Sequence, residues 1–200
     1  MYILILTIYC RFFINILISK LLRDQIINNV QKIKKDGRVI AKLLPGDYYV
    51  TKNEEEITTV LGSCVSFCIK DTENYVGGMN HYIYPKSNPE NNNGIPDSCY
   101  GDLSIGLLMD NYQNQGGKLD KIEIMLYGEG KILSGQSNVG EQNIEVAQKY
   151  LAENNMTVSA SDVGGQFSRK ITFYPKTGEV RMRKLSAAHN KFIASKEGSV

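Results

Sequence analysis

The stretch Leu61-Gly62-Ser63-Cys64-Val65-Ser66-Phe67-Cys68 is followed, seventeen residues after Cys64, by His81 at the end of Gly77-Gly78-Met79-Asn80-His81. Apolar residues at 65, 67 and 69 alternate with the residues between them, which is the period of a β-strand. Asp71-Thr72-Glu73-Asn74 is a polar turn cluster that precedes a second apolar run. The segment between Cys64 and His81 is therefore predicted to be a β-hairpin.

The expected register of this hairpin brings a thiol to an imidazole. A turn centred on residues 71–74 pairs residues whose numbers sum to 145, so that Cys64 faces His81. Directly opposite side chains have Cβ atoms about 4.5 to 5.5 Å apart, where a thiol and an imidazole can exchange a proton. A one-residue slip would turn the two side chains to opposite faces, so the inference depends on an even register.

Composition indicates one globular domain. The chain has 200 residues, of which 42% are hydrophobic and 22% charged, which is typical of a protein with its own core. Residues 1–40 contain seven Lys or Arg and two acids, which leaves sixteen bases and nineteen acids in the remainder. Because the body is slightly acidic, we expect no nucleic-acid partner.

Cysteine and histidine usage argues against a metal site. The spacing of the four cysteines fits no zinc-ligand pattern, and only His81 and His189 could join them. We therefore expect no metal and no cofactor, and a reducing compartment in which the thiols stay reduced. The cysteines are Cys10, Cys64, Cys68 and Cys99.

Residues 1–38 are expected to be an extension of a domain that spans 39–200. Residues 2–19 are almost wholly apolar, broken by Arg11 and Asn15 and followed by Lys20 and Arg23. This pattern is compatible with a marginal membrane span, an amphipathic interfacial helix or a start codon placed too far upstream. Membrane contact is expected only if the extension is a real part of the protein, and the basic residues after it would keep the body in the cytoplasm.

The remaining pattern predicts an α/β protein of the α+β type. It should contain largely antiparallel β-sheets in a sandwich-like core flanked by helices, with the Cys and the His on a β-hairpin. Residues 85–99 are expected to be a surface loop, and Pro175-Lys176-Thr177-Gly178 to be the turn of a terminal hairpin. Helices are predicted at about 102–114 and 140–154, and strands at 40–44, 48–51, 57–61, 122–126, 171–174 and 180–185.

Several ordered motifs resemble the chemoreceptor glutamine deamidase family, CheD, of bacterial and archaeal chemotaxis. The likeness covers residues 43 to about 185 and is specific because the motifs occur in order at matching spacing. The motifs are Leu43-Leu44-Pro45-Gly46-Asp47-Tyr48-Tyr49-Val50, Thr58-Thr59-Val60-Leu61-Gly62-Ser63-Cys64, Gly77-Gly78-Met79-Asn80-His81, Tyr100-Gly101-Asp102, and Asp162-Val163-Gly164-Gly165 with Arg169-Lys170.

The resemblance implies a catalytic set of Cys64 as nucleophile, His81 as base and Thr58, six residues before the Cys, as the group that orients the base. Thr59 is a rival for the third role. The chain departs from the family at Tyr127-Gly128-Glu129-Gly130, where a Phe-Gly-Gly-Ala-type segment is usual, and at Gln142, where an Arg is common. These departures put the usual partner-binding mode of that loop in question.

The other candidate residues surround this set. Gly62 and Ser63 are expected to shape the backbone donors of an oxyanion hole, because Gly62 permits an unusual backbone angle and close approach. The substrate or partner groove is expected to involve Asn80, Asp162, Gly164, Gly165 and Arg169. We expect Cys68 to be structural and assign no role to Cys10 or Cys99.

The resemblance implies a cytoplasmic enzyme, associated with membrane-bound receptor arrays, that converts specific glutamines of methyl-accepting chemoreceptor cytoplasmic domains to glutamate. A thiolate activated by an imidazole suits this chemistry, through a thioester on Cys64. A glutamate methyl ester has the same carbonyl, so methylesterase activity is a possible side reaction. The family also implies binding to a CheC-type phosphatase, and the alternative function is a weakly catalytic or non-catalytic protein that stimulates this phosphatase. A thiol protease or redox protein is disfavoured, because Cys64 and Cys68 are four residues apart rather than in Cys-x-x-Cys spacing.

Overall fold

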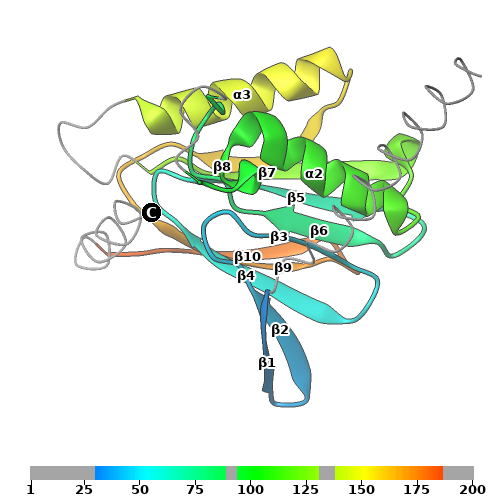
Figure 1. The fold of residues 1–200 in the computed structure, drawn as a ribbon. Coiled ribbons are helices and arrows are strands. Elements are labelled where there is room, and N and C mark those ends of the chain that lie inside the picture. The colour runs from blue at the N-terminus through cyan, green and yellow to red at the C-terminus, as the bar shows by residue number, and fades with distance from the viewer. Residues whose placement is uncertain (1–29, 89–93, 131–137, 187–200) are drawn as a thin grey trace, which may run out of the picture.

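The computed structural model describes residues 30–88, 94–130 and 138–186 (Figure 1). These residues form three layers, in which two helices cover one five-stranded sheet and a second five-stranded sheet packs against its other face (Figure 1). The predicted α+β class with a sandwich of two sheets and flanking helices is confirmed.

The outer sheet, which we call sheet A, joins the N-terminal strands to the C-terminal hairpin. Across the sheet the order is β1 (Gln31–Lys35), β2 (Arg38–Lys42), β4 (Glu55–Leu61), β9 (Arg169–Tyr174) and β10 (Glu179–Lys184). In β4, buried residues alternate with half-buried ones, because one face packs on the core and the other faces outward. The turn at 175–178 connects β9 and β10 in an antiparallel pair, as predicted.

The central sheet, sheet B, contains a hairpin that Cys64 precedes and His81 follows. Its order is β3 (Tyr48–Thr51), β6 (Gly77–Asn80), β5 (Val65–Asp71), β7 (Ile122–Gly128) and β8 (Val158–Val163). Strand β5 lies in the middle of sheet B and is buried at six of its seven positions. Its sequence alternates, yet both faces are buried, because Phe67 and Ile69 pack with the helices while Cys68 lies between the two sheets.

The two described α-helices are α2 (Gly101–Asn114) and α3 (Val139–Glu153), within two residues of the predicted bounds. They bury their apolar faces against sheet B, where Ile105, Leu108 and Ala147 join Phe67 and Ile69 in one hydrophobic cluster. A second cluster fills the space between the two sheets, so the core has two layers. Short 3₁₀ helices occur at Asp97–Cys99 and Leu119–Lys121.

Pairing is largely antiparallel, as expected, but two pairs are parallel. Strand β2 pairs in parallel with β4, and β7 pairs in parallel with β8 after the α3 crossover. The intervening β3 belongs to the other sheet, so β2 and β4 can run in the same direction side by side.

The N-terminal boundary falls inside a hairpin. Strand β1 pairs with β2, with Lys35 opposite Arg38, so residues 31–35 belong to sheet A. The apolar segment 2–19 with Cys10, and also His189, lie outside the described residues, so the anchor stays a prediction. Within the part of the chain that is described, no helix is long and apolar enough to cross a membrane.

Candidate active site

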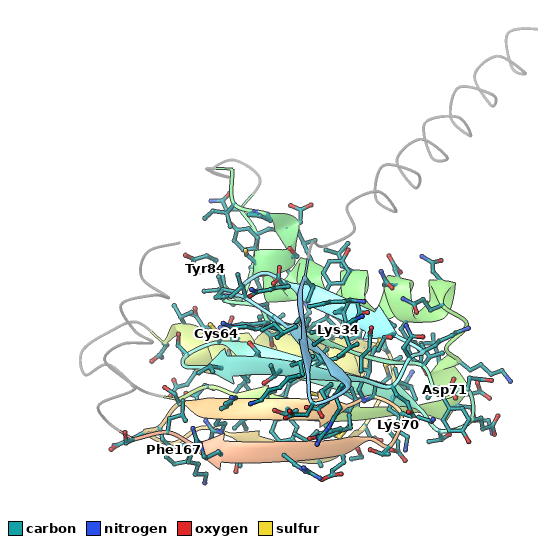
Figure 2. The ribbon with its side chains drawn as sticks, turned by 90° about the horizontal axis from the view of Figure 1, so that it is seen from below. Lys34, Cys64, Lys70, Asp71, Tyr84 and Phe167 are labelled. Atoms are coloured by element: carbon teal, nitrogen blue, oxygen red, sulfur yellow. The ribbon has the colours of Figure 1, made fainter. Side chains whose placement is uncertain are left out.

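Cys64 lies where the chain crosses from one sheet to the other. Strand β4 of sheet A ends at Leu61 and strand β5 of sheet B begins at Val65, so the corner between them holds Cys64 (Figure 2). Its side chain is fully buried and belongs to the cluster between the sheets. The thiol is not part of a disulfide.

His81 immediately follows β6 and is only 1% exposed. Its backbone is fixed by the turn before β3, because its N–H donates to Asp47 O over 2.8 Å and its carbonyl accepts from Gly46 N over 2.7 Å. The backbone of His81 therefore has a defined position at the end of β6, between β3 and β5.

The predicted register of the hairpin is wrong by two residues. The pairs Cys68–Met79 and Lys70–Gly77, and the bridge between Val65 and Tyr82, all have numbers that sum to 147 rather than 145. Cys64 therefore does not directly face His81, which lies two residues closer to the turn than the position opposite Cys64.

The side chain of Asp71 and the backbone of Tyr75 explain this shift of the register. The Asp71 carboxylate accepts the backbone N–H groups of Glu73 and Asn74 over 2.7 and 2.8 Å, and Tyr75 adopts a left-handed φ of 56°. The four-residue turn is thus 72–75, closed by a hydrogen bond from Asp71 N to Val76 O.

An even shift keeps every side chain on its predicted face. Cys64 and His81 therefore still point toward the space between the sheets, on the side where Cys68 and Met79 lie. They are diagonal neighbours, whose Cα atoms in an antiparallel ladder are about 7 to 8 Å apart. An imidazole ring spans much of such a distance, so the pair remains suited to proton transfer.

Thr59, and not Thr58, contacts the imidazole. Thr59 Oγ1 lies 2.7 Å from His81 Nδ1 and is buried. Thr58 Oγ1 donates instead to Ile171 O over 2.8 Å. Because β4 side chains alternate, Thr59 points inward and Thr58 outward, and the prediction that Thr58 orients the base is wrong.

The hydrogen bonds of Thr59 determine the tautomer of His81. The Thr59 hydroxyl donates its proton to Leu43 O over 2.9 Å, so its oxygen accepts the proton on His81 Nδ1. This leaves a lone pair on Nε2, which has no hydrogen-bond partner among the described residues. Burial lowers the pKa of His81 to about 3, so the ring is neutral near pH 7 and its Nε2 can accept a proton.

The loop after β7 holds the Cys64 corner in place. Glu129 N donates to Cys64 O over 2.9 Å, and Gly130 N donates to Gly62 O over 2.7 Å. A trans peptide points its N–H away from its C=O, so fixing Gly62 O also fixes the direction of the N–H of Ser63. The corner therefore presents its backbone donors in a set orientation.

Gly128 is the glycine that this arrangement requires. Its φ is 132°, and a Cβ atom built on it would lie 2.2 Å from Cys64 O. Only glycine allows both the backbone angle and the close approach. The left-handed backbone beside Cys64 thus lies at Gly128, inside the segment 127–130 in which this chain departs from the family pattern.

Asn143 of α3 is a residue that the sequence analysis missed. Its Nδ2 donates to Ile83 O over 2.7 Å and to Ser63 O over 3.3 Å, and its backbone carbonyl accepts from Tyr82 Oη over 2.8 Å. It thereby joins the segment before Cys64 to the segment after His81. The sequence could have indicated Asn143, because it is a polar residue on the apolar face of a helix. It lies three residues before buried Val146 and four before buried Ala147.

Asn80 is not placed in a groove. Its Oδ1 accepts from Phe67 N over 2.8 Å and its Nδ2 donates to Ser104 Oγ over 3.1 Å. Its side chain faces α2, on the opposite side of the strand from His81, so the expectation for Asn80 is wrong.

The other expected groove residues brace the loop that holds Cys64. Arg169 is 1% exposed, and its Nε donates to Asp162 Oδ1 over 2.6 Å while its guanidinium also donates to Gly164 O. Gly164 N in turn donates to Gly128 O over 3.1 Å. Gly165 follows with a φ of 86°. These residues lie near the site, but a role in binding a substrate stays a prediction.

The other described cysteines are buried. Burial raises the pKa of the Cys68 thiol, which lies in the cluster between the sheets, so Cys68 suits the structural role predicted for it. Burial also raises the pKa of Cys99, whose carbonyl accepts from the backbone N–H groups of Ile83 and Tyr84. Across residues 30–88, 94–130 and 138–186, no group of three or more potential ligands could hold a metal ion.

Comparison with known proteins agrees with the motifs. The sequence profile of the family described as "CheD chemotactic sensory transduction" matches residues 83–184. A protein of Methylobacillus flagellatus is 37% identical over 182 residues, which cover 89% of this chain and 90% of that protein.

Two further relatives carry the same name as that protein, "Probable chemoreceptor glutamine deamidase CheD". The relative from Hydrogenovibrio crunogenus is 38% identical over 164 residues, covering 81% of this chain and 86% of its own. The relative from Hahella chejuensis is 35% identical over 167 residues, covering 82% and 79%. This chain therefore belongs to the CheD family.

Proposed function

We propose that the protein is a chemoreceptor glutamine deamidase in which Cys64 is the nucleophile, His81 the general base and Thr59 the residue that orients the base. The observation that carries this proposal is the bond between Thr59 Oγ1 and His81 Nδ1, because it leaves Nε2 ready to accept a proton on the face that also holds Cys64. The names of the relatives support the choice of substrate.

The first half of the reaction forms a thioester. Cys64 Sγ attacks the side-chain carbonyl carbon of a glutamine while its proton passes to His81 Nε2, and the carbonyl oxygen becomes an oxyanion. The N–H groups of Ser63 and Cys64 are the proposed donors to this oxyanion. His81 then gives its proton to the nitrogen, the C–N bond breaks, and ammonia leaves.

The second half restores the enzyme. His81 takes a proton from water, and the hydroxide attacks the thioester carbonyl. The C–S bond breaks and the proton on His81 returns to the sulfur. The net change is the hydrolysis of one carboxamide by one water to a carboxylate and an ammonium ion, because ammonia takes the proton that the new carboxylic acid loses, with no cofactor.

Burial explains why proton transfer and attack are coupled. The lowered pKa of His81 disfavours an imidazolium in the resting site, so the imidazole is neutral in the ground state. Once the imidazolium forms beside the developing oxyanion, it is a strong acid and readily protonates the leaving nitrogen. Because Cys64 is fully buried, the arriving glutamine must displace the side chains that cover it.

The substrate and the partners follow from the family. The proposed substrate is a set of glutamines on the cytoplasmic domains of methyl-accepting chemoreceptors, where each turnover adds one negative charge. A glutamate methyl ester offers the same carbonyl with a better leaving group, so methylesterase activity is proposed as a side reaction. The proposed regulatory partner is a CheC-type phosphatase.

Mass spectrometry of a receptor cytoplasmic fragment tests the proposal. We expect the wild-type protein to produce the mass gain of deamidation at specific glutamines, and Cys64→Ala to abolish it, because the substitution removes the proposed nucleophile. Cys68→Ala is the matched control, since it removes a buried thiol from the same cluster and should leave the activity largely intact.

Two results would refute the enzymatic proposal. One is no mass gain with correctly folded wild-type protein, and the other is an undiminished gain with Cys64→Ala. Stimulation of a CheC-type phosphatase without any mass gain would favour the alternative function, in which the chain acts only through that partner.

A further inference from the structure

The outer face of sheet A carries an excess of positive charge. The pairing registers place one continuous row of side chains on this face, from Gln31 through Lys42, Thr58 and Thr172 to Arg181. The hydrogen-bond contact between Thr58 Oγ1 and Thr172 Oγ1, 3.2 Å apart, agrees with this placement. The same registers add Lys35 and Arg38 at one end and Lys170 and Arg183 at the other.

Four of these bases are unneutralised. Two others are paired on the face itself, Arg38 with Glu56 at 2.9 Å and Arg181 with Glu179 at 2.7 Å. The remaining four are exposed and form no ion pair with any residue that the structure describes. They are Lys35, Lys42, Lys170 and Arg183, and we call them the basic quartet.

This face is also open. The helices cover sheet B on the far side of the molecule, so no described helix lies over the outer face of sheet A (Figure 1). Strands about 4.8 Å apart make it a broad surface, from which the β1–β2 hairpin projects (Figure 1). Beyond residue 40 the chain as a whole has nineteen acids and sixteen bases. The outer face of sheet A therefore has the opposite charge balance to that part of the chain.

We propose that the outer face of sheet A docks on an anionic lipid surface. A broad surface of separate, flexible bases suits a plane of negative charge, because attraction to such a plane needs no fixed ligand geometry. Apolar Ile33, which is 43% exposed, lies on the same face beside half-buried Ile40. It adds apolar contact at the edge formed by β1.

The sequence before β1 supports a lipid rather than a protein or nucleic-acid partner. Residues 2–19 are almost wholly apolar, and Lys20 and Arg23 follow them. The chain leads from that segment into β1, at the edge of the basic face. An apolar segment joined to a basic surface supplies the two contributions that stable membrane association needs.

Vesicle sedimentation tests the proposal with the full chain. We expect the wild-type protein to bind phosphatidylcholine vesicles containing about 30% phosphatidylserine more tightly than pure phosphatidylcholine vesicles, and to lose this preference in high salt. Each base near an anionic surface contributes about fivefold to binding, so Lys35→Gln, Lys42→Gln, Lys170→Gln and Arg183→Gln together should weaken it by at least about a hundredfold.

A charge-matched variant controls for net charge. Lys52→Gln, Lys86→Gln, Lys118→Gln and Lys149→Gln remove four exposed bases that lie outside sheet A, and this variant should keep at least a tenth of the wild-type affinity. Circular dichroism and thermal melting should show that both variants fold. Three results would overturn the proposal. They are an equal loss of vesicle affinity in the two variants, retained binding in the quartet variant, and no preference of the wild type for anionic vesicles. Binding to polyglutamate or RNA but not to the vesicles would also overturn it.

Discussion

A single hydroxyl on β4 determines which nitrogen of His81 can act as a base. Thr59 and Thr58 are adjacent, yet only Thr59 reaches Nδ1, because neighbouring side chains of a strand point to opposite faces. A neutral hydroxyl orients an imidazole without adding a counter-charge, so its contribution is geometric. The identity of the base therefore depends on the inward face of β4.

Substitution of the two threonines separates these roles. We expect Thr59→Val to lower the rate of deamidation by about a hundredfold, because the ring loses the acceptor for its Nδ1 proton and leaves its productive orientation. Thr58→Val removes a hydroxyl on the outer face and should change the rate by less than about threefold. Time courses of deamidation on the receptor fragment measure both. Greater loss in Thr58→Val than in Thr59→Val would contradict the assignment.

At the scale of elements, three other parts of the chain hold the corner around Cys64. They are the segment after β7, helix α3 and strand β9. The segment 128–130 clamps the carbonyls of Gly62 and Cys64, and Asn143 of α3 ties Ser63 to Ile83. Arg169 in turn fixes the backbone near Gly164, which contacts Gly128. The hairpin alone does not set the site, because its ladder reaches only the bridge between Val65 and Tyr82.

Gly128→Ala tests this clamp. The added Cβ would meet Cys64 O at 2.2 Å with φ at 132°, so we expect a loss of about 3 kcal/mol in the free energy of unfolding and a large fall in activity. Gly106→Ala in α2 is the matched control, since nothing lies within 4 Å of its added Cβ, and it should stabilise the protein by about 0.5 to 1 kcal/mol. Denaturant unfolding measures both, and equal effects would refute the clamp.

At the scale of the whole molecule, the neutral His81 couples folding to pH. Its pKa rises from about 3 in the folded protein to 6.5 in the unfolded chain. Below pH 6.5 the unfolded state therefore binds a proton that the native state does not, and the free energy of unfolding falls as the pH falls from 6.5 toward 3. Well above pH 6.5, where the imidazole is neutral in both states, this residue gives no pH dependence.

Replacement of the imidazole isolates the effect. Relative to His81→Asn, the wild-type protein should lose about 2 kcal/mol more in its free energy of unfolding between pH 6.5 and about 5. Equilibrium unfolding in urea across that range measures the difference, and His189 is common to both proteins. If the free energies of unfolding of the wild type and of His81→Asn changed equally with pH, His81 would not be held neutral by burial.

Sequence patterns were sufficient for most elements of the fold. The 3.6-residue periodicity predicted α2 and α3, and the alternation and turn residues predicted the strands and the C-terminal hairpin. They also predicted the faces of Cys64 and His81, because an even register error leaves faces unchanged. The register itself was wrong, since the Asp71 side chain and the left-handed Tyr75 moved the turn by one residue.

The sequence by itself determined the fold class and the family of this protein, and it predicted Cys64 and His81 as candidate catalytic residues, because local periodicity and ordered motifs are properties of the chain. Only the tertiary structure decided that Thr59 replaces Thr58, that Asn143 and Gly128 support the Cys64 corner, and that Asn80 faces a helix. Each of these contacts depends on which residue of a distant segment lies next to the side chain in the folded protein. That is set by the packing of the two sheets and α3, which no local pattern contains.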